Sequence, residues 1–452
     1  MRHPPKKVTY RFSPKTQKLV RESIPTYTEV EKKIRENFGT FADSKNAPIH
    51  RWFQYPAGFS YKAVNYILDQ HVIVPGHTVY DPFVGTGTTI VVCKQRGIES
   101  YGVEAHPFVH EIAEVKTDWD INFKALREEI QNTSLRLEFS IADAEREDVS
   151  HLPKLVRSCF SRHNLQRLLF IRSFVQQSVS KRFQKLFFVA LTCALRQASA
   201  AATGWPYIAP KKRIKEKDGL EAFIKQLYRM IEDLESVPPE FRKTPSHIIL
   251  GDARNSKLPS SFFNLGFTSP PYLNNYDYAD RTRLETYFNG YASSWGDITE
   301  KVRKKLIVSA TTQINRGNYG VREILLDELR HANARVANEL QEKVNLLSIK
   351  RLEKGGKKSY DIMVGQYFND MTLALLDIFR VLKPGASMVL ILGDSAPYGV
   401  HIPTEQYLGE IGLGIGFKEY RILELRQRGG KWKGNPQRHH VALRESILTL
   451  RK

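Results

Sequence analysis

A glycine-rich turn in the segment DPFVGTGTT, residues 81–89, is the first place where the residue types could support chemistry. The turn follows an apolar run and precedes a stretch with helical character, and Gly85 and Gly87 stand at the bend. Without a β-carbon, glycine lets backbone N–H groups approach a ligand closely. The turn lacks the Lys-Ser/Thr of a phosphate-binding P-loop and the full G-x-G-x-x-G of a dinucleotide site. It therefore favours another kind of cofactor, although D-P-F and G-x-G also occur as plain turns.

Acidic residues end this predicted strand and two later ones. Asp81 closes the first strand, and its carboxylate suits the positively charged amino group of a methionine-like moiety. Glu104, in SYGVEAHP, closes the second and could accept hydrogen bonds from both hydroxyls of a ribose. Together these two residues describe an adenosyl amino acid. Asp252, in GDAR, could accept from an adenine amine, but a turn or capping role fits it nearly as well.

The segment TSPPY, residues 268–272, forms a rigid loop at the carboxyl edge of the predicted sheet, where open α/β folds bind ligands. Methylation of an aromatic amine requires that the nitrogen lone pair turn toward the methyl donor. The Ser269 hydroxyl and the Pro270 carbonyl could accept from the amine and favour a tetrahedral nitrogen. Tyr272 could stack on a base swung out of the helix, an interaction worth about 1–3 kcal/mol. An isolated SPPY would more simply be a proline-rich turn.

In this order, the glycine turn, the acidic second strand end, GDAR and TSPPY resemble the amino-methyltransferases of DNA. The serine in TSPPY resembles the N4-cytosine group, since the N6-adenine group more often has Asp or Asn there. The segment YPAGFSYKA also looks like the additional cofactor motif of that family, with Tyr55 where His is commoner. The resemblance covers about half the chain. It implies direct methyl transfer from S-adenosyl-L-methionine to the N4 amine of a flipped cytosine.

The resemblance also assigns roles to individual residues. The implied cofactor contacts are Phe59, Ser60, Asp81, Phe83, Gly85, Gly87, Thr88, Glu104 and Asp252. The implied catalytic loop consists of Ser269, Pro270, Pro271 and Tyr272. No metal ligand is implied.

The elements that must position these residues follow a β-α-β rhythm, which indicates a parallel sheet with helices on both faces. We expect an α/β, Rossmann-like methyltransferase core with two largely helical insertions. A short helix is possible around TEVEKKIRENF, residues 28–38. The expected parts are a basic extension over 1–44, the cofactor-binding half of the core over 45–110, a helical insertion over 111–245, the core with the catalytic loop over 246–290, a second charged helical insertion over 291–364 and the C-terminal part of the core over 365–452.

The first insertion is the favoured candidate for target recognition. Basic residues are interleaved there with Trp205, Tyr207 and the KKRIKEKD run, residues 211–218, as contacts to phosphates and bases would require. For any single basic residue, a solvated charged surface is about as good an interpretation.

The bulk composition is consistent with a DNA partner. The 452 residues carry a formal net charge of +20, which attracts polyanions, although a generally basic protein remains an alternative. The three cysteines form no C-x-x-C pair, which predicts neither a disulfide framework nor a zinc site. No secretory h-region or membrane-spanning run of roughly 18 apolar residues occurs. We therefore expect a soluble, cytoplasmic protein that binds double-stranded DNA, with a cognate restriction endonuclease as a further candidate partner.

Several alternatives stay open at this point. A carbon-5 cytosine methyltransferase would need a nucleophilic cysteine, usually in Pro-Cys, whereas Cys93 falls in the helix after the glycine turn and is expected to lie in the core. Adenine N6 in DNA and an amino group in RNA are alternatives with the same chemistry. A non-catalytic nucleic-acid-binding protein with this fold is an alternative of another class, against which the intact turn and TSPPY argue.

Overall fold

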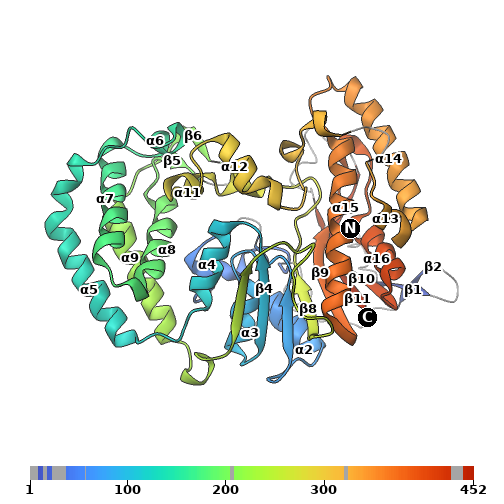
Figure 1. Cartoon of the computed structure of the whole chain (residues 1–452), viewed down its shortest axis with the longest axis horizontal. Coiled ribbons are helices and arrows are strands. Elements are labelled where there is room, and N and C mark those ends of the chain that lie inside the picture. The colour runs from blue at the N-terminus through green and yellow to red at the C-terminus, as the bar shows by residue number, and fades with distance from the viewer. Residues whose placement is uncertain are drawn as a thin grey trace, which may run out of the picture.

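The computed structural model describes residues 9–13, 18–22, 37–55, 58–203, 208–319, 324–428 and 441–452. These residues form a nine-stranded mixed sheet in the order β2-β1-β10-β11-β9-β8-β3-β4-β7 (Figure 1). Its strands are β1 (Thr9–Ser13), β2 (Lys18–Glu22), β3 (Thr78–Asp81), β4 (Glu99–Glu104), β7 (Ser246–Leu250), β8 (Phe263–Thr268), β9 (Leu382–Gly393), β10 (Glu419–Arg428) and β11 (Leu443–Arg451).

Five neighbouring strands, β9, β8, β3, β4 and β7, are parallel, and the others join the sheet antiparallel. The central strands are apolar runs because helices cover both faces of a parallel sheet. All four residues of β3 are buried, and so are the last eight of β9. The other seven strands can be numbered by their order along the chain, leaving out the β1–β2 hairpin. From β7 to β10 across the sheet they are then the third, second, first, fourth, fifth, seventh and sixth strands. This arrangement confirms the expected Rossmann-like α/β fold.

The order reverses between β3 and β8, which makes this pair the switch point where such sheets bind ligands. Helices α2 (Tyr61–Gln70), α3 (Thr88–Gln95) and α4 (Pro107–Thr117) flank these strands. The first seven residues of α3 are all buried, so α3 is a core helix and not an amphipathic one. Cys93 is among them, as expected.

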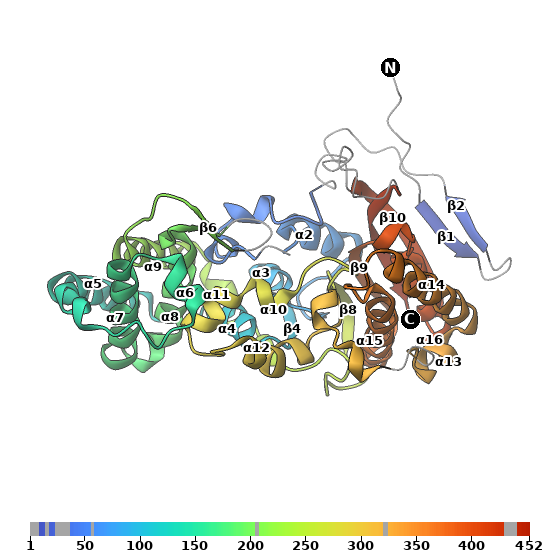
Figure 2. The same cartoon turned by 90° about the horizontal axis from the view of Figure 1, so that it is seen from above.

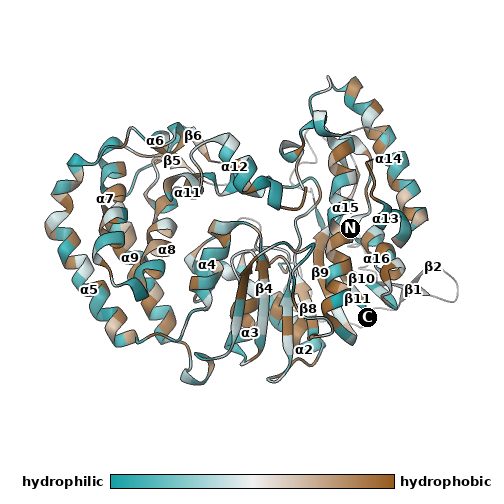
Figure 3. Ribbon diagram, viewed as in Figure 1, coloured by the Kyte–Doolittle hydropathy of each residue, from teal (hydrophilic) through white to brown (hydrophobic). Residues whose placement is uncertain are grey.

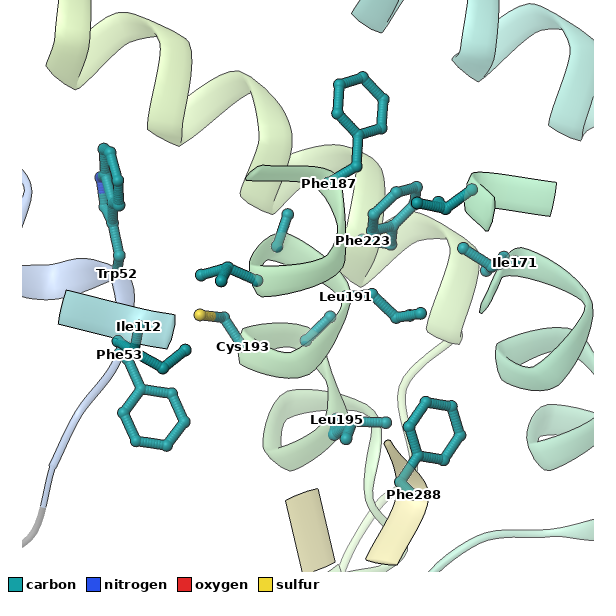
Figure 4. Close-up of a cluster of buried hydrophobic side chains, with 14 of the residues drawn as sticks. Trp52, Phe53, Ile112, Ile171, Phe187, Leu191, Cys193, Leu195, Phe223 and Phe288 are labelled. Atoms are coloured by element: carbon teal, nitrogen blue, oxygen red, sulfur yellow. The ribbon is translucent and has the colours of Figure 1, made fainter. Parts of the chain in front are cut away.

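A helical lobe lies beside the β4–β7 end of the sheet (Figures 1 and 2). It contains α5 (Phe123–Ser140), α6 (Lys154–Cys159), α7 (Arg162–Ser178), α8 (Lys181–Ala198), α9 (Gly219–Glu235) and a small sheet of β5 (Ala201–Ala202) and β6 (Ala209–Arg213). Its helices carry hydrophobic stripes on otherwise hydrophilic surfaces (Figure 3). Side chains from α7, α8 and α9 meet in one buried cluster, which includes Ile171, Phe187, Leu191 and Phe223 (Figure 4).

The buried carboxylate of Asp233, in α9, joins this lobe to the core. It accepts hydrogen bonds from the Ile49 backbone N–H at 2.8 Å, the Trp52 indole N–H at 2.9 Å and Arg51 Nε at 3.1 Å. Its side chain is only 2% exposed. A buried carboxylate with several donors has its charge compensated, so the lobe is fixed to the segment that leads into YPAGFS.

A second group of helices lies at the other end of the sheet, near β9–β11 (Figure 1). It comprises α13 (Asp327–Ala332), α14 (Ala334–Glu353), α15 (Tyr360–Val381) and α16 (Thr404–Ile415), of which α16 packs on β10 and β11. The short helices α10 (Tyr278–Arg281), α11 (Arg283–Phe288) and α12 (Trp295–Lys301) lie between the catalytic loop and this group along the chain. None of the helices in the described ranges is long and apolar enough to cross a membrane.

The structure differs from the expectations in two places. Residues 1–44 were expected to be only an extension, yet β1 pairs with β10 and adds a hairpin to the sheet, at the end away from the helical lobe (Figure 2). The sequence Lys-Pro-Gly, residues 383–385, predicts a turn before the strand, but these residues lie within β9, where the pairing with β8 jumps from Phe263–Leu382 to Leu265–Ser387. Most of the possible helix over 28–38 lies outside the described residues, and Asn37 and Phe38 form a turn.

Candidate active site

The carboxyl ends of four parallel strands bring the predicted site residues to one edge of the sheet. Asp81 ends β3, Glu104 ends β4, Asp252 follows β7, and Thr268 ends β8. The edge includes the switch point between β3 and β8. The motifs found along the chain therefore meet in space.

A cavity with a volume of about 820 Å³, counting its open mouth, occupies this edge. Eight of the thirteen predicted site residues line it: Phe59, Phe83, Gly85, Thr88, Glu104, Asp252, Ser269 and Pro271. The other five are not on its wall: Ser60, Asp81, Gly87, Pro270 and Tyr272.

The carboxylate of Asp81 is fully buried behind this wall. Thr268 and Thr89 each donate to it through Oγ1 at 2.5 Å, and the Phe83 backbone N–H donates at 3.0 Å. Burial raises the pKa of Asp81 to about 6, against the effect of these hydrogen bonds. The residue therefore joins the glycine turn to the catalytic loop. A direct contact with a cofactor ammonium stays a prediction.

The glycine turn has the backbone that its sequence requires. Gly85 has φ of 53° and Gly87 has φ of 86°, both in the left-handed region. Gly87 is the N-cap of α3, and a side chain there would come within 3.4 Å of the Ala113 Cβ in α4. Gly85 contributes directly to the cavity wall, while Gly87 permits the bend and the close approach of α4.

Glu104 lies on the cavity wall with its carboxylate held by backbone donors. The His106 N–H donates to Oε1 at 2.8 Å, and the N–H groups of Gly85 and Ala105 also interact with it. Burial raises the pKa of Glu104 to about 7. The carboxylate is thus positioned to accept from a ligand hydroxyl, as the sequence predicts.

The YPAGFS segment contributes in two different ways. The Phe59 ring lines the cavity and packs edge-on against Phe267, with ring centroids 5.4 Å apart. The Ser60 hydroxyl is already engaged, since it donates to Asp43 Oδ2 at 2.8 Å and accepts from the Lys62 N–H at the start of α2. Ser60 therefore acts as a helix cap in this structure. Its predicted contact with the methionine moiety has no direct support from the geometry.

Asp252 lines the cavity but forms an ion pair. Arg254 Nη2 lies 2.7 Å from Asp252 Oδ2, and Arg254 Nη1 lies 2.7 Å from Asp370 in α15. The two readings of Asp252, as a turn residue and as a cofactor contact, are therefore compatible. The Asp252 side chain is 40% exposed, so its carboxylate can still accept from a ligand.

The catalytic loop presents Ser269 to the cavity in a defined orientation. Its hydroxyl donates to the Ile391 carbonyl of β9 at 3.0 Å. A hydroxyl has one hydrogen, so the lone pairs of Ser269 Oγ remain able to accept. Pro271 lines the cavity beside it, whereas Pro270 is buried.

Tyr272 is more enclosed than a base-stacking role would require. Its ring is only 8% exposed, and its hydroxyl donates to Glu445 Oε1 at 3.1 Å. Glu445 in turn accepts from Arg426 Nε at 2.8 Å. The guanidinium of Arg428 lies 5.2 Å from the ring centroid of Tyr272. A base that stacked on this face would have to displace Arg428.

The sequence interpretation missed several residues of the cavity wall. Tyr278, the first residue of α10, lies there with Tyr55, their ring centroids 6.4 Å apart, and His106 lies near them. The LNNYDY run directly after TSPPY was a usable signal for Tyr278. Residues 305–307 also line the cavity, and their sequence carries no motif that indicates this.

The fold and the site define a methyltransferase, with a glycine turn, an acidic second strand end and a proline-rich catalytic loop around one cavity. Comparison with known proteins agrees. Residues 6–115 match the model of a DNA methylase family. The type II methyltransferase M.BsoBI of Geobacillus stearothermophilus is 25% identical over 98% of this chain and 93% of its own length. M.MvaI of Kocuria varians is 24% identical over 88% of this chain and 87% of its own.

These matches support the resemblance to the DNA amino-methyltransferases that the motifs indicated. The family match ends before the catalytic loop, while the relatives align over nearly the whole chain. The comparisons do not divide the family by target base.

Proposed function

We propose that this DNA methyltransferase transfers a methyl group from S-adenosyl-L-methionine to the exocyclic N4 amine of cytosine at a specific DNA sequence. The observation that carries the choice of base is Ser269. In place of the Asp or Asn commoner in the N6-adenine group, a neutral hydroxyl faces the cavity with its hydrogen committed to Ile391.

The cavity wall fits the proposed cofactor. Gly85 supplies closely approaching backbone, Glu104 supplies an acceptor for ribose hydroxyls, and Phe59 supplies an apolar contact. When bound, this cofactor supplies an electrophilic methyl group on a positively charged sulfur.

Ser269 Oγ accepts from the target amine, with the Pro270 carbonyl as the second acceptor. Two acceptors hold the amine hydrogens and direct the nitrogen lone pair at the methyl group. After the transfer the methylated nitrogen releases one proton to solvent water, so the product amine is neutral. No covalent bond to the protein forms, which agrees with the burial of Cys93, Cys159 and Cys193.

A cytosine inside a duplex cannot reach this cavity, so the proposal includes flipping of the target base. Tyr278 lines the cavity. Tyr272 is not on the cavity wall, and the guanidinium of Arg428 lies over its ring. We propose that Tyr272 contacts the base after Arg428 has moved.

We propose that residues 111–245, the first helical insertion expected from the sequence, form the target-recognition lobe. A groove between α6 and β6 is lined by Lys154, Arg157, Lys211 and Arg213. Such a cluster can bind DNA phosphates. Trp205 and Tyr207 lie outside the described residues.

The relatives M.BsoBI and M.MvaI are named as type II methyltransferases. By analogy, we propose that this protein belongs to a restriction-modification system, with a cognate endonuclease as its partner and a location in the cytoplasm. The three cysteines are free, which is compatible with a reducing compartment.

The decisive experiment is methyl incorporation. Purified protein is incubated with labelled cofactor and double-stranded DNA, and the DNA is digested to nucleosides for mass identification. The proposal requires N4-methylcytosine. N6-methyladenine would overturn the choice of base, label on RNA alone would overturn the choice of nucleic acid, and no label on either would favour a non-catalytic binding protein.

A further inference from the structure

His106 is a fully enclosed side chain on the wall of the cofactor cavity. It is 1% exposed, it is the N-cap residue of α4, and its side chain makes no capping hydrogen bond. It follows Glu104 by two residues, and its backbone N–H donates to that carboxylate at 2.8 Å. Its ring therefore has a fixed place beside the expected ribose contact.

Thr282 is the hydrogen-bond partner of one ring nitrogen of His106. The Thr282 hydroxyl lies 2.7 Å from His106 Nε2, and it also lies 3.2 Å from the Tyr278 carbonyl and 3.4 Å from the Ala279 carbonyl. In the arrangement in which Thr282 gives its single hydrogen to one of these carbonyls, it accepts from Nε2. His106 Nδ1 is then an acceptor with a free lone pair.

Among the described residues, no side chain or backbone group bonds to His106 Nδ1. A buried acceptor without a partner costs about 1–3 kcal/mol in a folded protein, so this nitrogen needs an explanation. Burial also lowers the pKa of His106 to about 3, so the ring is neutral near pH 7. A neutral buried acceptor on a cavity wall is suited to a neutral donor on the ligand.

We propose that His106 is a further cofactor-binding residue, whose Nδ1 accepts a hydrogen bond from a ribose hydroxyl of the bound cofactor. This inference rests on the proposed function for the identity of the cofactor. A ribose offers two hydroxyl donors, and the Glu104 carboxylate already receives backbone N–H groups from Gly85, Ala105 and His106. Glu104 then accepts from one hydroxyl and His106 from the other.

Two variants test the roles of the two ring nitrogens of His106 separately. In His106→Gln, the amide can reach the position of Nε2 and keep the bond to Thr282, but no acceptor remains at Nδ1. In His106→Asn, the shorter amide places its oxygen near the position of Nδ1 and can replace that acceptor. Thermal melting of both variants checks that they fold.

Calorimetric affinities are measured for S-adenosylhomocysteine and for its 2′-deoxy and 3′-deoxy analogues, so the readout does not depend on methyl transfer. We expect wild-type protein to bind both deoxy analogues more weakly than the parent, and to bind the analogue that lacks the hydroxyl facing His106 about five- to tenfold more weakly, which is the worth of one neutral hydrogen bond. The His106→Gln variant should bind the parent weakly by a similar factor and should not discriminate against that analogue. The His106→Asn variant should still discriminate.

The outcomes distinguish this inference from the proposed function. If wild-type protein does not bind S-adenosylhomocysteine, the proposed cofactor is wrong. If wild-type protein binds it and His106→Gln discriminates against both deoxy analogues as wild type does, the proposed role of His106 is wrong. Equal losses for all three ligands in both variants would also overturn it, because they would indicate a purely structural role.

Discussion

Thr268 Oγ1 donates a hydrogen bond of 2.5 Å to the carboxylate of Asp81, across the adjacent ends of β8 and β3. Asp81 begins the glycine turn, and Thr268 begins the TSPPY loop. The two motifs are thus held in a fixed relation through a carboxylate that does not itself line the cavity. In an enzyme that must align a methyl group with an amine, such a bond acts on geometry.

Thr268→Val should weaken this relation while preserving the shape of the side chain. The variant leaves one buried lone pair of Asp81 without its donor, so the free energy of unfolding should fall by about 1–3 kcal/mol. Urea unfolding at pH 7 measures this loss. Thr89→Val, on the other oxygen of the same carboxylate, is the matched variant, since it should cost similar stability but leave the catalytic loop in place. Equal effects of the two variants on methyl transfer would contradict the argument.

The stability should depend on pH through Asp81 and Glu104. Burial raises their pKa values to about 6 and about 7, so the folded state binds more protons than the unfolded state between about pH 4 and 7. The stabilising contribution is complete below pH 4 and is lost as the pH rises through this window. For Asp81 the change is roughly 3 kcal/mol.

Urea unfolding of wild-type protein and Asp81→Asn across this window tests the pH dependence, because the amide has no proton to release. The unfolding free energy of the wild type should fall relative to that of Asp81→Asn as the pH rises. A difference that stays constant from pH 4.5 to 7.5 would show that Asp81 does not titrate in this range.

Ser269→Ala should reduce the rate of methyl transfer by about 100-fold or more, because it removes one of the two acceptors for the amine. The affinity for S-adenosylhomocysteine, measured by calorimetry, should remain nearly unchanged. Ser260→Ala, an exposed serine outside the cavity wall, serves as the control. A collapse of cofactor affinity in Ser269→Ala would show that the residue belongs to the cofactor site instead.

Tyr272 allows the ring and the hydroxyl to be tested separately. Tyr272→Phe loses the hydrogen bond to Glu445 but keeps the ring, so about 1 kcal/mol of stability and little transfer activity should be lost. Tyr272→Ala removes the ring and should abolish most transfer with cofactor affinity retained. Unfolding curves and single-turnover rates give the two readouts. If Tyr272→Phe were as inactive as Tyr272→Ala, the hydroxyl would be the catalytic group.

The sequence indicated the strand ends because parallel strands carry apolar runs with polar residues directly after them. It could not indicate the partners of those residues. Thr268 is far from Asp81 along the chain, and Thr282 is similarly distant from His106. The bonds that orient these side chains depend on how the sheet assembles.

The missed parts of the cavity have a related cause. Lys305 ends the short 3-10 helix Arg303–Lys305, and residues 306–307 follow it without regular secondary structure, so no periodicity in the sequence places residues 305–307 on the cavity wall. Tyr272 was recognised as a loop aromatic, but its enclosure depends on Arg428 and Glu445 from the last two strands. The pairing of β1 with β10 was missed because a short hairpin in a basic segment resembles an unstructured arm in sequence.

The anchoring of α9 through Asp233 has a consequence for how the proposed target-recognition lobe can be exchanged among relatives. The lobe is not a freely portable module, because its buried carboxylate requires donors from Ile49, Arg51 and Trp52, which lie at the start of the cofactor-binding half expected over 45–110. A chimera that receives a foreign lobe would leave these donors without their acceptor. Recombination that transfers the lobe intact therefore has to transfer residues 49–52 with it.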